Sequence, residues 1–122
     1  MIPSLFNNNL SLLHKALDLT AIRHRTIAGN IANVNTPNYR RRSFRFEEEL
    51  REALETGSLL DFSEVQGSYE TPRNTMVRNN GNNVDIDEET VNLSDNSFLY
   101  TVYAQLYSQR AQMIKTAIRG GR

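Results

Sequence analysis

A seven-residue repeat near the N-terminus constrains the fold of this chain more than any other feature of the sequence. Its members alternate steps of three and four, and most are apolar: Leu10, Leu13, Leu17, Thr20, His24, Ile27, Ile31 and Val34. Residues at this spacing share one face of an α-helix, and so narrow a face suits a helical partner better than a broad core. We therefore expect a long helix that begins at Leu10, after a frayed polar lead at residues 1–9.

A second repeat with the same spacing occupies the C-terminal end of the chain. Its members are Leu93, Asn96, Leu99, Tyr103, Leu106, Arg110, Met113 and Ala117. Acidic residues precede it, and Asp85 can cap a first helical turn together with Glu88, three residues later. The sequence therefore predicts a second helix from about Glu88 to Arg119, which Gly120 and Gly121 would end.

These two patterns predict a mainly α fold. Two long helices at opposite ends of the chain can form an antiparallel coiled-coil-like pair, with a short extended or β-hairpin segment between them. Only 39% of the residues are hydrophobic and there is no Trp, so a large private core is not expected. The open faces of the pair would then need burial by other subunits.

The stretch IAGNIANVNTPNY, at residues 27–39, ends the first predicted helix. Pro37 disfavours the helical conformation of the residue before it, so we expect the helix to finish near Asn35 or Thr36. The last turn is rich in poor helix formers and needs support from side chains.

Asn30 and Asn33 can supply this support, because residues three apart share a helix face. Their carboxamides can hydrogen-bond the last helical carbonyls and the turn beyond them, or they can bond a neighbouring chain. An ordinary asparagine-rich helix end is the alternative interpretation.

Charge is distributed unevenly, although the net charge is zero. Residues 1–46 carry seven Lys or Arg and one acid, residues 47–95 carry three and thirteen, and residues 96–122 carry four and none. The chain thus has basic ends and an acidic middle. With the helices, this pattern predicts three segments: an N-terminal lead and long helix at 1–39, an acidic, loop-rich middle at 40–84, and a C-terminal helix at 85–122.

The middle segment contains signals for short elements. Arg and Phe alternate at residues 42–46, which permits a short strand, and residues 46–54 predict a short helix. Asn80-Gly81 favours a type I′ turn, with strands at residues 76–78 and 84–86 forming a hairpin around it.

Several classes of function are excluded. The absence of Cys excludes a disulfide scaffold and cysteine-ligated metals, and His14 and His24 lie too far apart on one helix to share a metal. The acids from Asp85 onward lack the Gly and terminal Glu of a calcium loop. We identify no catalytic constellation, cofactor site, signal peptide or membrane-spanning segment, so we expect a protein that is not an enzyme and does not insert into a membrane.

The basic run Arg40, Arg41, Arg42 and Arg45 has interleaved Phe residues, a pattern that can bind nucleic acid. Three glutamates follow at once, from Glu47 to Glu49, and would repel a phosphate backbone. We interpret the run as a charged loop and expect no nucleic-acid partner.

Two motifs resemble the bacterial flagellar rod and hook proteins. The first resembles A-x-N-x-A-N-x-x-T-P-x-Y, which marks the end of the N-terminal helix in that family. The second, NNVDIDEETVNLSDNSFLYTVYAQL, is similar to the C-terminal segment of the proximal rod proteins. The family usually has Gly where this chain has Asn38, and Asn tolerates the left-handed region well enough for the turn to survive. The matching residues are Ala28, Asn30, Ala32, Asn33, Thr36, Pro37 and Tyr39 in the first motif, and Asn83, Val84, Asp85, Glu89, Leu93, Asn96, Leu99, Tyr100, Ala117 and Ile118 in the second.

The resemblance implies a structural subunit of the flagellar basal-body rod. Family members stack helically around an export channel through their terminal helices, and the flagellar type III apparatus exports them without a cleaved signal peptide. The implied location is the periplasmic rod, and the implied partners are further copies, the rod proteins FlgC, FlgF and FlgG, the adaptor FliE and the export gate. The resemblance further implies that Asn30, Asn33, Thr36 and Pro37 set the turn after the first helix, and that subunits meet near Asn96 and Tyr100.

Two other classes share part of this pattern. A self-contained cytoplasmic coiled-coil adaptor would have the same paired helices, but it would stay helical as an isolated monomer or dimer. A basic-helix nucleic-acid binder would lose affinity steeply with salt. Neither explains why the asparagine motif and the acid-capped second helix occur together.

Overall fold

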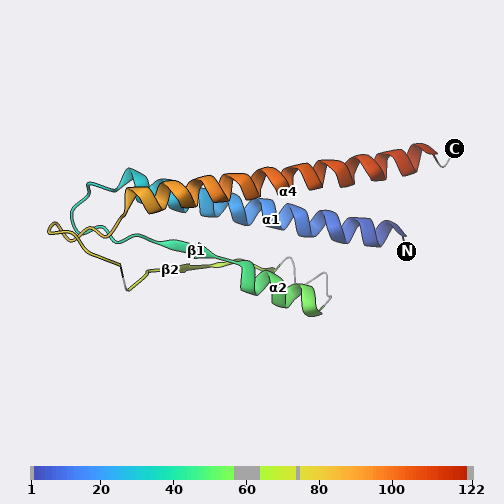
Figure 1. The fold of residues 1–122 in the computed structure, drawn as a ribbon. Helices are drawn as coiled ribbons and strands as arrows, with labels where there is room; N and C mark the ends of the chain where they lie inside the picture. Colours follow the sequence, from blue (N-terminus) through green and yellow to red (C-terminus); the bar gives the residue numbers. More distant parts are fainter. Residues whose placement is uncertain (1, 57–63, 74, 121–122) are drawn as a thin grey trace.

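Two long helices from the two ends of the chain lie side by side in the computed structural model, which describes residues 2–56, 64–73 and 75–120 (Figure 1). Helix α1 is Ile2–Ala32 and helix α4 is Ile86–Gly120. They run antiparallel, so both chain termini lie at one end of the molecule. The mainly α fold with a terminal helix pair is therefore confirmed.

A small module lies along α1 and is made of strand β1 at Ser43–Arg45, helix α2 at Glu47–Thr56 and strand β2 at Ser68–Glu70 (Figure 1). The short helix and the first short strand were both expected from the sequence. The two strands pair antiparallel, with Phe44 opposite Tyr69. A β element is thus present, but it pairs residues 43–45 with residues 68–70, not residues 76–78 with residues 84–86.

The polar lead at residues 1–9 was predicted to be frayed, and that prediction is wrong. Helix α1 already begins at Ile2, so Pro3 falls in its first turn. Proline is tolerated there because the first amides of a helix have no intrahelical partner.

Helix α1 uses two faces rather than the single predicted one. Thr20 and Ile27 of the repeat are buried, but Ala16 and Leu19 are buried too, and His24 is exposed. A straight helix has 3.6 residues per turn, so a 3.5-residue repeat drifts around its surface and cannot face one partner throughout. The prediction that His24 lies in the contact is therefore wrong.

The second face of α1 carries the apolar core. Leu19 packs with Phe44 and Phe46 around β1, with Ala53 of α2 and with Val65. Gly67 has a φ of 70°, and a Cβ there would lie 2.3 Å from the Phe44 ring, so the ring packs directly on the glycine backbone. The core thus joins the small module to α1.

The turn before α4 is real, but the predicted hairpin around it is not. The Gly81 amide donates to the Arg78 carbonyl at 2.9 Å and the Arg78 amide donates to the Asn82 carbonyl at 2.9 Å, which closes a three-residue loop. Only Gly81 in this loop has a positive φ, of 83°, whereas a type I′ turn needs two such residues. Neither residues 76–78 nor residues 84–86 form a strand.

The flanks of this turn bond a different segment, which explains the missing hairpin. The Asn38 amide donates to the Asn80 carbonyl at 2.9 Å, and the Asn83 amide donates to the Tyr39 carbonyl at 3.4 Å. The chain after α1 therefore takes the place of a hairpin partner. None of the helices in the described ranges is long and apolar enough to span a bilayer.

Candidate assembly site

Four asparagines join the turn after α1 to the segment that leads into α4. We call Asn30, Asn33, Asn82 and Asn83 the asparagine junction. Three of them are buried, and buried carboxamides are costly unless hydrogen-bonded. The hydrogen-bond partners of these side chains therefore show which segments of the chain the asparagine junction holds together.

The side chain of Asn30 bonds both backbone groups of Arg42, as a neighbouring β-strand would. Its Nδ2 donates to the Arg42 carbonyl at 2.7 Å, and its Oδ1 accepts from the Arg42 amide at 3.0 Å. The Tyr39 hydroxyl also donates to the same oxygen, at 3.1 Å. Asn30 thus fixes the chain that leaves the turn against the side of α1.

Asn33 ends the helix. Its Nδ2 donates to the Gly29 carbonyl at 2.8 Å, and its Oδ1 accepts from the Thr36 hydroxyl at 3.1 Å. The Thr36 amide donates to the Asn33 carbonyl at 3.0 Å, a tighter turn than an α-helix makes. Helix α1 therefore ends at Ala32, earlier than the predicted end near Asn35 or Thr36.

Asn82 connects the two ends of the chain most directly. It is 0% exposed, and its Nδ2 donates to the carbonyls of Asn33 and Thr36, both at 2.8 Å. Its Oδ1 accepts from the Val84 amide at 2.8 Å and from Arg78 at 2.9 Å. Because a carboxamide offers two donors and two acceptor sites, this side chain is fully used.

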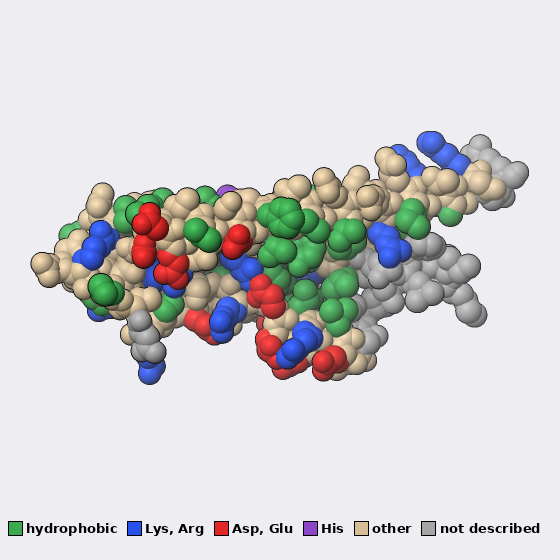
Figure 2. Space-filling model, viewed as in Figure 1, with side chains coloured by type: hydrophobic (Ala, Val, Ile, Leu, Met, Phe, Trp, Pro, Cys, Tyr) green, Lys and Arg blue, Asp and Glu red, His purple; other side chains and the backbone are tan. Residues whose placement is uncertain are grey.

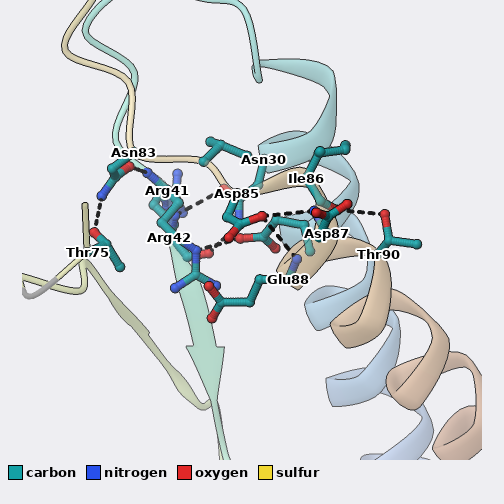
Figure 3. Close-up of polar contacts among 12 residues, drawn as sticks. Asn30, Arg41, Arg42, Thr75, Asn83, Asp85, Ile86, Asp87, Glu88 and Thr90 are labelled. Carbon is teal, nitrogen blue, oxygen red and sulfur yellow. Dashed lines mark hydrogen bonds and ion pairs between the residues drawn. The ribbon is translucent and has the colours of Figure 1, made fainter. Parts of the chain in front are cut away.

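Asn83 and an ion pair continue the connection toward α4. The Arg41 amide donates to Asn83 Oδ1 at 2.6 Å, and Asn83 Nδ2 donates to the Thr75 hydroxyl at 2.7 Å (Figure 3). The Arg41 guanidinium donates to Glu89 on α4 at 2.5 Å. Arg41 is 7% exposed and Glu89 is 0% exposed, so this pair is almost completely removed from water. Arg41 therefore holds both the loop and the helix.

Asp85 caps α4, as predicted. Its carboxylate accepts from the amides of Asp87 at 3.0 Å and Glu88 at 3.4 Å (Figure 3). These amides have no partner within the helix, and a negative charge there is favoured by the helix dipole. The cap sets the start of α4 directly after the asparagine junction.

Asn96 links the helix pair from within. It is buried, and its Nδ2 donates to the Thr20 carbonyl at 2.8 Å. Its Oδ1 finds no hydrogen-bond partner among the described residues. The side chain therefore fixes α4 against the backbone of α1 at one point along the pair.

Arg23 joins α1 to the small module. It donates to the Phe44 carbonyl at 3.1 Å, lies 4.3 Å above the Phe46 ring centroid and pairs with Glu47. Partial burial by itself would raise the pKa of Glu47, but the hydrogen bonds and the charge of Arg23 outweigh it and lower this pKa. Glu47 therefore stays ionised and keeps the pair intact at neutral pH.

Gly81 is confined by the chain that crosses it. A Cβ at this position would lie 2.3 Å from Asn38 Oδ1 and 3.2 Å from Asn38 Cα. We expect Gly81→Ala to lower the free energy of unfolding by at least about 1–2 kcal/mol, because the positive φ and the contact both disfavour a side chain. Urea unfolding followed by circular dichroism, at a concentration where the chain is helical, measures this loss.

Gly29 provides the matched control, because a Cβ there meets nothing within 4 Å. Alanine in that helical position should stabilise the protein by about 0.5–1 kcal/mol. If both alanine variants shifted the unfolding midpoint in the same direction, the described approach of residues 38 and 81 would be wrong.

The structure brings together only part of the residues singled out from the sequence. Asn30, Asn33, Tyr39, Val84 and Asp85 lie in or beside the asparagine junction, and Asn38 has a φ of 62° as its left-handed role requires. Leu93, Asn96 and Leu99 lie farther along α4 and are half-buried or buried. The exposed members are Ala28, Ala32, Thr36, Pro37, Asp85, Tyr100, Ala117 and Ile118, of which Thr36 still bonds Asn33 and Asn82.

Sequence reasoning missed the roles of Arg41, Asn82, Asn83 and Glu89. The partners that Arg41 and Asn82 have in the other half of the chain lie between 42 and 49 residues away, so no local pattern marks them. Asn83 and Glu89 matched the flagellar motif, but the match assigned them no contact. In a sequence, a basic run with one buried arginine also cannot be distinguished from a run whose side chains are all exposed to solvent.

This arrangement can hold two chain segments together, and it has no evident chemistry beyond that. Across the described residues, no group of His, Cys, Asp and Glu is placed to bind a metal ion. Carboxamides and a paired arginine position backbone; they are poor proton donors or nucleophiles near neutral pH. The site is therefore a structural one.

Comparison with known proteins supports a single family. A family described as "Flagella basal body rod protein" matches residues 13–40. The chain is 32% identical to "Flagellar basal body rod protein FlgB" of Bacillus subtilis, over 98% of this chain and 99% of the relative. It is 28% identical to the protein of that name from Borrelia hermsii, over 95% and 99%, and 26% identical to the one from Escherichia coli, over 92% and 94%.

Proposed function

This chain belongs to the FlgB family of flagellar basal body rod proteins and is a structural rod subunit, not an enzyme. We propose that its copies assemble helically with other axial proteins and form the proximal part of the drive shaft and export channel. In this role the chain supplies surfaces for stacking, and the asparagine junction keeps the two terminal helices in register.

The observation that carries this proposal is the exposed apolar surface of α4. Large apolar side chains are exposed along most of its length: Val91, Phe98, Tyr100, Leu106, Tyr107, Met113 and Ile118. Residues 96–109 contain no charged residue. Figure 2 shows hydrophobic side chains gathered along the helix pair on the visible face. A helix with so much exposed apolar surface is stable only when neighbouring molecules bury it.

The three segments of the chain have different proposed roles in the rod. The helices within residues 1–39 and 85–122 form the inner pair that lines the rod, and residues 40–84 make the outer contacts. Tyr100 is exposed and available to a neighbouring subunit, whereas Asn96 holds the pair within one chain. The proposed neighbours are further copies of this chain, the rod proteins FlgC, FlgF and FlgG, the adaptor FliE and the flagellar type III export gate, in the periplasm.

Circular dichroism and analytical ultracentrifugation of the isolated chain, over a concentration series, test the proposal. Exposed apolar helices that await partners are marginal in dilute solution. We expect helicity and sedimentation coefficient to rise together with concentration. A fully helical monomer or closed dimer at every concentration would instead support the self-contained coiled-coil adaptor.

A further inference from the structure

Helix α4 carries opposite charges at its two ends, and each charge lies beside exposed apolar side chains. Near its start, Asp87, Val91, Asp95 and Phe98 follow at steps of four, four and three, so they share one face. All four are exposed, and Val91 and Phe98 are 59% and 69% exposed. We call these four residues the acidic stripe.

The far end of α4 presents the complementary surface. Lys115, Ile118 and Arg119 are exposed neighbours on one face of the helix, and Ile118 is 72% exposed. We call these three residues the basic tip. Residues 96–120 contain three basic residues and no acid. Figure 2 shows the same contrast, with acidic side chains over the beginning of α4 and basic side chains near its C-terminal end.

The charges of both surfaces form no ion pair within the described part of one molecule. Neither Lys115 nor Arg119 pairs with a described acid, and Asp95 has no described basic partner. They also cannot reach each other, because roughly 23 helical residues at about 1.5 Å per residue place them about 35 Å apart. Within one molecule both surfaces therefore remain open to water and available to a partner.

We propose that the basic tip of one copy packs against the acidic stripe of a second copy of this chain, an inference that rests on the proposed function and specifies one of its contacts. In the contact, Ile118 covers Val91 or Phe98 while Lys115 and Arg119 face the two aspartates. Apolar contact supplies the affinity, and charge supplies the orientation.

Such a contact joins two different surfaces, so each copy uses its tip on one neighbour and its stripe on the next. A contact of this kind builds an open stack unless the rotation between copies closes a ring. Val91 and Ile118 lie on opposite sides of α4, about 180° apart at 3.6 residues per turn. Successive copies are therefore displaced sideways as well as lengthwise, which a staggered array requires.

Helix α2 is the competing acidic surface. Its outer face carries Glu52 and Glu55, but Arg51 pairs with Glu48 and reduces the negative charge there. The large exposed apolar side chain on α2 is Leu54 alone. The acidic stripe is favoured because it combines acids with two large apolar side chains on one face.

Charge reversal on either side tests the contact. We expect Asp87→Lys with Asp95→Lys, and separately Lys115→Glu with Arg119→Glu, to weaken self-association at least tenfold in sedimentation equilibrium at low salt. Mixing the two double variants should restore association, because each then offers the surface that the other needs. The control, Glu52→Lys with Glu55→Lys on α2, makes the same charge change as the first variant and should associate as wild type.

The outcomes separate this inference from the proposed function. If wild type associates and the reversal variants associate equally well, or if the α2 control is weakened as much, the contact is wrong while the rod role stands. If the mixture fails although circular dichroism shows that both variants fold as wild type does, the contact is also wrong. If wild type itself stays monomeric at all concentrations, both proposals fail.

Discussion

Replacing Glu89 with leucine is expected to lower the free energy of unfolding by about 3–5 kcal/mol, because it leaves a buried guanidinium without its counter-charge. Arg41 is 7% exposed and its guanidinium donates to Glu89 at 2.5 Å. The backbone amide of Arg41 is also bonded to Asn83, so Arg41 cannot turn outward without disturbing the asparagine junction. Urea unfolding followed by circular dichroism, at a concentration where the chain is helical, measures the loss.

Two further variants isolate the cause. Glu88→Leu changes an exposed carboxylate one position away and should cost no more than about 0.5–1 kcal/mol, the size of a helix-dipole contribution. Arg41→Met combined with Glu89→Leu removes both charges and should recover most of the loss, since apolar side chains of similar size can replace a buried ion pair. Equal effects of the two single glutamate variants would show that Glu89 is not buried against Arg41.

The long helices were predictable because their signals are local. Repeats of three and four residues marked both of them, and Asp85 marked the start of α4 through a contact with the next few amides. A left-handed conformation of Asn38 was expected because the family that the chain resembles usually has Gly at this position. In each case the residues that fix the conformation lie within a turn or two of one another.

The errors came where side chains or distant segments compete for the same backbone groups. The hairpin around residue 80 looked favourable in isolation, but its flanks bond Asn38 and Tyr39 instead. The end of α1 was placed too late because Pro37 was treated as the stop signal, whereas the side chain of Asn33 closes the helix first. Long-range hydrogen bonds decided the first outcome, whereas the second was decided by the local contacts of Asn33 with Gly29 and Thr36.

Only the part of the candidate site that lies on α1 was predictable from the sequence. The spacing of Asn30 and Asn33 correctly suggested that they bond the helix end and the turn. Asn82, the long-range partner of Asn33, had no signal, because one asparagine among several near a turn is unremarkable in a sequence. The asparagine junction therefore becomes visible only when the two chain ends are placed together.

Asn82→Ala should have the second large effect, a loss of about 2–4 kcal/mol of folding free energy, because it strips several partners of hydrogen bonds at a buried position. The Asn33 and Thr36 carbonyls would lose their donor, and the Val84 amide would lose its acceptor. The same urea unfolding experiment measures the change.

The donor half of the Asn82 carboxamide can be tested separately from the acceptor half. Asn82→Asp keeps an oxygen for the Val84 amide but turns a second, charged oxygen toward the Asn33 and Thr36 carbonyls. This variant should therefore be no more stable than Asn82→Ala, although it is nearly the same shape as wild type. Asn79→Ala, in the same loop and exposed, should stay within about 0.5 kcal/mol of wild type. An Asn82→Asp protein as stable as wild type would contradict the assigned bonds and, with them, the view that Asn82 joins the two ends of the chain.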